Sequence, residues 1–91
     1  MKHCIDIEAV TNRLKRIEGQ VRGIIKMIED DKSCEDILIQ IGSAKSALHK
    51  TGQVILESHL SHCIIDGVRE GNAEETVKKL SVAIEQFSRI V

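Results

Sequence analysis

The sequence contains no proline, tryptophan or tyrosine, and Phe87 is the single residue of the Phe, Trp and Tyr group. Its core must therefore be filled by Ile, Val, Leu and Ala, and a chain of 91 residues buries little surface by itself. Charged residues make up 30% of the chain, and this composition favours long amphipathic helices over a β fold. Small helical chains of this kind often complete their cores by forming oligomers. We expect one all-α domain covering residues 1–91 that associates with copies of itself.

The start of the chain, Met1-Lys2-His3-Cys4, lacks the apolar run of a signal peptide or of a transmembrane segment. We therefore expect a cytoplasmic protein with no membrane association. The three cysteines are an odd number, and a reducing compartment disfavours disulfide bonds. The cysteines are then expected to be metal ligands, reactive thiols or small core residues.

Apolar residues recur at steps of three and four, which is typical of helices that bury one face. The first expected helix runs from Ile5 to Asp30 and carries the apolar stripe Val10, Leu14, Ile17, Val21, Ile24 and Ile28. The third begins at about Asn72 and carries Val77, Leu80, Ile84, Phe87 and Val91. Gly67 and Gly71 indicate the loop before it.

The second helix is expected to begin near Ser33, which resembles a capping residue because Asp36 follows three positions later. Its stripe of Ile37, Ile41, Ala44, Leu48 and Ile55 is interrupted at Thr51-Gly52. Either one long helix spans residues 34–65, or this dipeptide splits it into a hairpin. We favour the long helix, because a lone glycine costs only about 1 kcal/mol and no proline accompanies it. Such a long helix would be buried by antiparallel pairing in a dimeric bundle.

His59 and Cys63 lie four residues apart in this second helix, which places imidazole and thiolate on one side. The spacing is typical both of a soft metal site and of buried core residues. Cys34 stands at the N-terminus of the same helix, 25 residues before His59. One continuous helix would separate these two residues by about 37 Å. In an antiparallel pair of such helices, Cys34 of one chain would lie beside His59 and Cys63 of the other.

The net charge is −1, yet one segment is locally basic. From Arg13 to Lys26 the basic residues are Arg13, Lys15, Arg16, Arg22 and Lys26, against the single acid Glu18. Such a stripe can bind phosphate even when the whole chain is neutral, or it can be a solvated helix face. Neither paired carboxylates on one face nor a phosphate loop is present, so we do not expect an enzyme.

The segment Arg13 to Gly23, Arg-Leu-Lys-Arg-Ile-Glu-Gly-Gln-Val-Arg-Gly, resembles the first-helix signature of the copper-sensitive operon repressor (CsoR) family. The run from Cys34 to Cys63 is similar to the sensor helix of that family, including Ile-Gly-Ser-Ala-Lys-Ser-Ala-Leu and Glu-Ser-His-Leu-Ser-His-Cys. The resemblance covers nearly the whole chain. It implies an all-helical dimer, usually paired into a tetramer, that binds double-stranded operator DNA when apo and is released by an inducer.

Members of the family respond to copper(I), nickel or cobalt, formaldehyde, or persulfide. The resemblance implies that Cys34, His59 and Cys63 are the ligands of the copper branch, and we predict Cu(I) as the inducer. The nickel and cobalt branch adds an N-terminal His, which makes His3 and Cys4 candidates for further ligands of Ni(II) or Co(II). In the persulfide branch the two cysteines react without a metal. Two positions depart from the copper pattern: Ser33 stands where a Tyr is common, and Lys79 where a Glu is common.

The charge pattern and the resemblance together imply that DNA is bound by Arg13, Arg16, Gln20 and Lys50. The family has no helix-turn-helix, so we expect much of the specificity to come from DNA shape. The alternative from another class is a cytosolic metal-buffer protein without DNA binding. Such a protein would have no need of the basic first helix.

Overall fold

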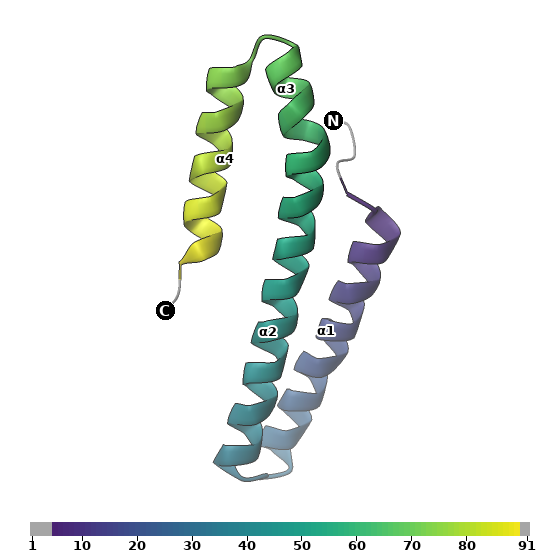
Figure 1. The fold of residues 1–91 in the computed structure, drawn as a ribbon. Helices are drawn as coiled ribbons and strands as arrows, with labels where there is room; N and C mark the ends of the chain where they lie inside the picture. Colours follow the sequence, from purple (N-terminus) through teal and green to yellow (C-terminus); the bar gives the residue numbers. More distant parts are fainter. Residues whose placement is uncertain (1–4, 90–91) are drawn as a thin grey trace. The chain divides into compact units, whose positions relative to one another are not determined.

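The computed structural model describes residues 5–89, and these residues form helices and turns without a strand. The chain runs through α1 (Ile7–Glu29), α2 (Cys34–His59), α3 (Ile65–Arg69) and α4 (Ala73–Ser88) (Figure 1). A π-helix, η1 (Leu60–Ile64), joins α2 directly to α3, so the second helical stretch is continuous from Cys34 to Arg69. The all-α class expected from composition is confirmed.

The first two helices begin at side-chain caps. The Asp6 carboxylate accepts a hydrogen bond from the Ala9 amide at 3.0 Å, and the Ser33 hydroxyl accepts one from the Asp36 amide at 3.1 Å. Each cap satisfies a backbone donor that a helix leaves without a partner in its first turn. The predicted role of Ser33 as a cap is confirmed.

Two turns close the helical stretches with the same hydrogen-bond pattern. In each, an amide reaches back five residues to a carbonyl, from Lys32 to Met27 at 2.9 Å and from Asn72 to Gly67 at 2.9 Å. This pattern is the Schellman motif, which needs a residue with positive φ just before the donor. Asp31 has φ 56° and Gly71 has φ 84°. Only the second turn has glycine at this position, and glycine adopts a positive φ without a steric penalty.

The second helix is long, as expected, and Thr51-Gly52 does not split it, because both residues lie inside α2. Two details differ from the sequence-based expectation. Gly67 was expected in a loop, but it lies within α3, and the loop begins only after Arg69. The π-helix was not expected at all. Hydrophobic periodicity does not reveal one extra residue in a single helical turn.

The helices divide into two units, and the boundary falls within α2. In the unit Asp6–Val54, α1 and the first part of α2 lie antiparallel, side by side (Figure 1). All buried side chains of the described residues belong to this unit: Val10, Ile17, Ala44 and Thr51. On each helix the two buried residues are seven positions apart, so each helix presents one narrow buried row to the other.

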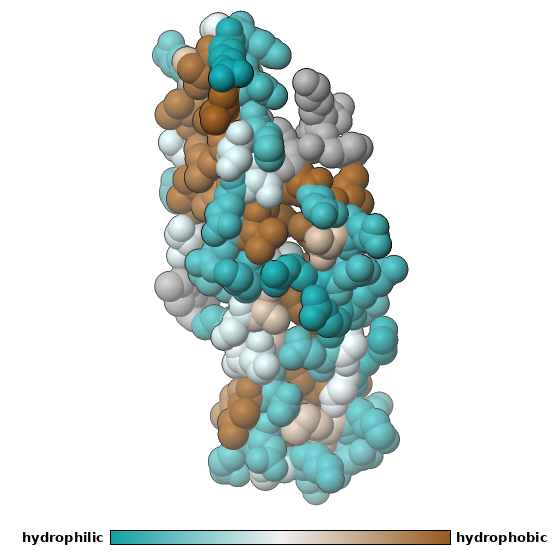
Figure 2. All heavy atoms as spheres, turned by 45° about the vertical axis from the view of Figure 1, so that its right-hand side comes forward, coloured by the Kyte–Doolittle hydropathy of each residue, from teal (hydrophilic) through white to brown (hydrophobic). Residues whose placement is uncertain are grey.

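In the single chain the expected apolar stripe of α1 is only partly buried. Val10 and Ile17 face α2, whereas Leu14 and Val21 are 42% and 45% exposed. On α2, Ile41 and Leu48 are 44% and 50% exposed. The stripe is wider than the contact between two helices, and its outer half stays open. Figure 2 shows such apolar surface in brown between hydrophilic side chains.

The unit from Ile55 onward contains the end of α2, η1, α3 and α4. A Cβ on Gly67 would meet the Thr76 side chain, so α3 and α4 approach closely where glycine leaves room. No described apolar side chain of this unit is buried, and Val77 and Val82 are 52% and 55% exposed. Among the helices formed by residues 5–89, none has an apolar stretch long enough to cross a bilayer.

Candidate functional site

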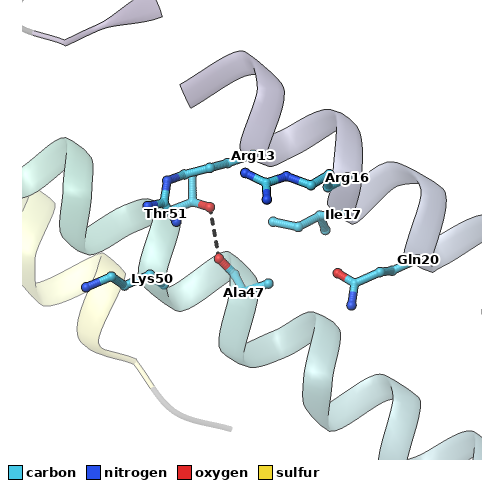
Figure 3. Close-up of a pocket in the computed structure, with 7 residues that line it drawn as sticks. All are labelled: Arg13, Arg16, Ile17, Gln20, Ala47, Lys50 and Thr51. Atoms are coloured by element: carbon cyan, nitrogen blue, oxygen red, sulfur yellow. Dashed lines mark hydrogen bonds between the residues drawn. The ribbon is translucent and has the colours of Figure 1, made fainter. Parts of the chain in front are cut away.

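A hollow of about 490 Å³ lies between α1 and α2 within the unit Asp6–Val54. Its lining consists of Arg13, Arg16, Ile17, Gln20, Ala47, Lys50 and Thr51 (Figure 3). All four residues predicted from the sequence to bind DNA are in this lining. The structure thus brings together residues of two helices that lie about thirty positions apart in the sequence.

Helical periodicity explains why these residues meet. An α-helix has about 3.6 residues per turn, so a step of three from a buried residue leads to one side of the buried row and a step of four to the other. A step of three leads from Val10 to Arg13 and from Ile17 to Gln20, and both of these line the hollow. On α2, two such steps lead from Ala44 through Ala47 to Lys50. The hollow therefore follows one flank of the helix pair.

The floor of the hollow is largely apolar, and its one hydroxyl group already has a hydrogen-bond partner. Ile17 and Thr51 are both buried, and the Thr51 hydroxyl donates a hydrogen bond to the Ala47 carbonyl at 2.8 Å (Figure 3). At its edge, the Gln20 amide nitrogen donates to the Ser43 hydroxyl at 3.4 Å, a long bond that links the two helices. The polar group of this floor is already hydrogen-bonded and is not free to bind a ligand. A ligand of the hollow would therefore be bound by its cationic side chains, Arg13, Arg16 and Lys50.

The positive charges of the hollow have no acidic neighbours. None of its lining residues is acidic, and neither Arg13 nor Arg16 has an acid three or four positions away on α1. By contrast, Arg22 and Lys26 pair with acids at i±4, at 3.5 and 3.3 Å. Since Arg13 and Arg16 are themselves three apart, they repel each other on the helix surface. The cations are thus concentrated on one flank and left available to an anion.

Two of the predicted metal ligands, Cys34 and His59, lie at the two ends of α2. Cys34 is the first residue of the helix and carries an exposed free thiol. His59 is the last residue of α2 and is half-buried. Cys63 belongs to the backbone of η1, and its side chain lies outside the description, as do His3 and Cys4 altogether. Within residues 5–89 of one chain, no three His, Cys, Asp or Glu side chains gather around a common point.

The π-helix is the feature of this region that sequence reasoning missed. It begins directly after His59 and contains Cys63, so the backbone between these two residues includes a wider turn than an α-helix has. Such single π-turns are frequent at functional sites. His62, expected at the surface, is exposed.

The two positions that depart from the copper pattern have local roles here. Ser33 caps α2, and its hydroxyl is engaged by the Asp36 amide. Lys79 pairs with Glu75 at 3.1 Å on the exposed surface of α4. An exposed i,i+4 pair contributes only about 0.3–0.5 kcal/mol, so it leaves the lysine available for other contacts.

Comparison with known proteins agrees with this architecture. A model of the metal-sensitive transcriptional repressor family matches residues 6–86. The chain is 42% identical over 82 residues to the copper-sensing transcriptional repressor CsoR of Bacillus subtilis (strain 168), with 90% of this chain and 81% of the relative covered. It is 47% identical over 79 residues to the copper-sensing transcriptional repressor RicR of Mycobacterium tuberculosis, with 85% and 82% covered. These relatives are transcriptional repressors, in agreement with the expectation that the chain is not an enzyme.

Two solved structures have the same fold. The crystal structure of the copper-sensing repressor CsoR with Cu(I) from Geobacillus thermodenitrificans NG80-2 is 46% identical, with a TM-score of 0.89 over 92% of this chain and 88% of that one. The nickel-responsive transcriptional regulator InrS is 32% identical, with a TM-score of 0.80 over 96% of this chain and 98% of that one. With its motifs, its fold and its relatives in agreement, the chain belongs to the metal-sensitive transcriptional repressor family, that of the CsoR proteins.

Proposed function

We propose that this repressor holds double-stranded operator DNA against the hollow between α1 and α2 and that Cu(I), bound by Cys34, His59 and Cys63 of two chains, releases it. The observation that carries the DNA half of the proposal is the hollow itself. Its rim holds the cations Arg13, Arg16 and Lys50, with no acid among the lining residues. Cations on phosphates supply most of the sequence-independent affinity for DNA, because they release condensed counterions.

A second copy of the chain would cover the flank opposite the hollow. Steps of four from the buried row lead to Leu14, Val21 and Leu48, which are exposed in the single chain. Apolar rows on two adjacent helices suit a helical bundle with another copy. Burying this flank leaves the cationic flank directed outward. Dimers or tetramers then repeat the hollow over a wider surface that can follow the shape of a duplex.

The donor set suits Cu(I). Cys34 and Cys63 supply two sulfur ligands and His59 supplies one nitrogen, and soft thiolates favour Cu(I). Cys34 and His59 are the first and last residues of a 26-residue helix, so an antiparallel second chain is the simple way to bring them to one point. Both curated relatives described above are copper-sensing repressors, and the solved relative from Geobacillus carries Cu(I).

A site divided between two chains couples ligand binding to quaternary structure. The ligand shifts the equilibrium toward the arrangement in which the donors of both chains meet. If this arrangement spaces the hollows differently along DNA, the ligand lowers operator affinity, and bound DNA lowers the affinity for the ligand by the same factor.

Nickel is the second candidate, favoured by the likeness to the nickel-responsive regulator InrS over 96% of this chain. Nickel would require further nitrogen or sulfur donors, and His3 or Cys4 would supply them. The titration that separates the candidates uses reduced protein under anaerobic conditions with Cu(I), Ni(II) or a persulfide donor, each read by loss of operator binding. We expect Cu(I) to release DNA at the lowest free concentration. Release by Ni(II) at a lower concentration than Cu(I) would assign the protein to nickel instead.

The DNA half is tested by salt dependence. Arg13→Ala and Lys50→Ala should each weaken operator binding and reduce the slope of log K against log salt by about 1 for each chain that contacts the DNA. The matched controls are Lys15→Ala on α1 and Lys45→Ala on α2, since neither lysine lines the hollow. An unchanged slope in both hollow variants would remove the proposed DNA surface and favour a metal-buffer protein.

The division of the metal site is tested by mixed dimers that carry Cys34→Ala on one chain and His59→Ala on the other. If ligands come from two chains, both substitutions affect the same site, and one of the two sites survives. Cu(I) binding at half the wild-type stoichiometry is the expected result. No remaining site would mean that the ligands meet within one chain.

A further inference from the structure

The hollow between α1 and α2 is concave and open to solvent. Its volume is about 490 Å³, which is enough for a small anion. A protein can hold the backbone of a duplex on a flat or convex cationic surface, without a hollow. The concave form is therefore a property that the DNA contact alone does not require.

The charge of the hollow exceeds what one phosphodiester can neutralise. Arg13, Arg16 and Lys50 bring three positive charges, whereas each DNA phosphate brings one negative charge, spaced by about 3.4 Å of axis along a strand. A condensed phosphate carries several negative charges within a few ångströms. The two guanidinium groups can each bind two phosphate oxygens, and the lysine adds a compact positive charge.

We propose that the hollow is also a binding site for a free condensed phosphate, such as inorganic triphosphate, and that this anion competes with operator DNA. The binding site itself does not depend on the proposed function, whereas the competition rests on it. Release of DNA by such an anion needs none of the metal ligands. The repressor would then have two independent inputs, one at the cysteines and one at the hollow.

Direct binding is measured first, with reduced, metal-free protein and sodium triphosphate in the absence of DNA and of divalent ions. Sodium chloride keeps the ionic strength constant, and calorimetry or phosphorus NMR gives the affinity. We expect saturable binding of one triphosphate per chain. Arg13→Ala and Lys50→Ala should each weaken it about tenfold, a loss of about 1.4 kcal/mol, since each removes a charged donor to the phosphate oxygens.

Lys15→Ala and Lys45→Ala are the matched controls, because they remove one charge from the same two helices outside the hollow. Their affinity for triphosphate should stay near that of the wild type, since separated surface charges are screened at physiological salt. Equal losses in the control and hollow variants would show ionic attraction only, without a site, and would overturn the proposal. The absence of saturable binding in the wild type would overturn it as well.

Competition is measured next, as operator binding with triphosphate or with sodium chloride at matched ionic strength. Triphosphate should displace DNA from the reduced, metal-free protein more strongly than chloride does. If triphosphate binds the hollow but leaves operator affinity unchanged, the competition is wrong and the DNA surface lies elsewhere. If the hollow variants lose DNA while the wild type binds no triphosphate, the proposed function stands and the anion site is wrong.

Discussion

The two units of the chain differ in how they obtain their stability. In Asp6–Val54, α1 and α2 bury a row of side chains on each helix, and every buried side chain of the described residues lies there. From Ile55 to residue 89 no described side chain is buried, and Val77 and Val82 are more than half exposed. The first unit contains the cationic hollow and Cys34, and the second contains His59 and Cys63.

This difference matches the two tasks of a repressor. A DNA surface gains from cations held in a fixed geometry, so it is well placed on a pair of helices that bury their own contact. A sensor must respond to its ligand, and elements that change during a switch are drawn from the less stable parts of a protein. The π-helix beside His59 and the small burial around it suit that second task.

The largest effect that can test this comparison is expected in the buried row. Ile17→Ala should lower the free energy of unfolding by about 2–5 kcal/mol, because Ile17 is only 6% exposed. Val77→Ala should change it by no more than about 0.5 kcal/mol, because Val77 is 52% exposed. Thermal or denaturant unfolding at one protein concentration measures both. An equal loss at Val77 would show that α4 is buried as well, against another copy of the chain.

A smaller effect is expected where the second unit is closely packed. In Gly67→Ala the new methyl group would meet the Thr76 side chain, and overpacking of this kind costs about 1–3 kcal/mol. Gly23→Ala is the control, because no described atom lies within 4 Å of its added Cβ and alanine favours the helix by about 1 kcal/mol. The Gly67→Ala, Thr76→Ala double variant should recover most of the loss. Stabilisation by Gly67→Ala alone would mean that α3 and α4 are not held closely together.

The turn of the second unit gives the next prediction. Gly71 has φ 84°, a conformation that an L-residue adopts at a cost of about 1–2 kcal/mol. Gly71→Ala should therefore destabilise the protein by about 1 kcal/mol, read from the midpoint of denaturant unfolding. No measurable change would show that the turn between α3 and α4 relaxes to another conformation without cost.

The corresponding turn of the first unit gives the smallest effect, with the opposite sign. Asp31 occupies the same place in the motif with φ 56°, so Asp31→Gly should stabilise the protein by less than about 1 kcal/mol. The midpoint of denaturant unfolding should rise, while operator affinity should stay unchanged because Asp31 does not line the hollow. A lower midpoint would mean that the Asp31 side chain contributes more to this turn than its backbone conformation costs.

Local chemistry allowed much of the helical structure to be predicted from the sequence. Steps of three and four between apolar residues located the helices, Ser33 indicated the start of α2, and the absence of proline left α2 uninterrupted at Thr51-Gly52. These features depend on neighbours within a few residues, which a sequence displays directly. The π-helix at Leu60–Ile64 was missed because it depends on a single extra residue in one helical turn. The helical position of Gly67 was missed because it depends on a tertiary contact with Thr76.

The tertiary structure alone decided which half of each apolar stripe is buried. The sequence predicts one stripe on α1, but the width of a two-helix contact buries Val10 and Ile17 and leaves Leu14 and Val21 open. The same geometry brings Arg13, Arg16 and Gln20 of α1 beside Lys50 of α2 around one hollow. The sequence determined that these residues are cationic or polar, that α1 has a basic flank, and that Cys34 and His59 lie 25 residues apart. Only the antiparallel packing of two helices could make Lys50 a neighbour of Arg13 and Arg16, because the pairing register of distant segments is not encoded in the period of either one.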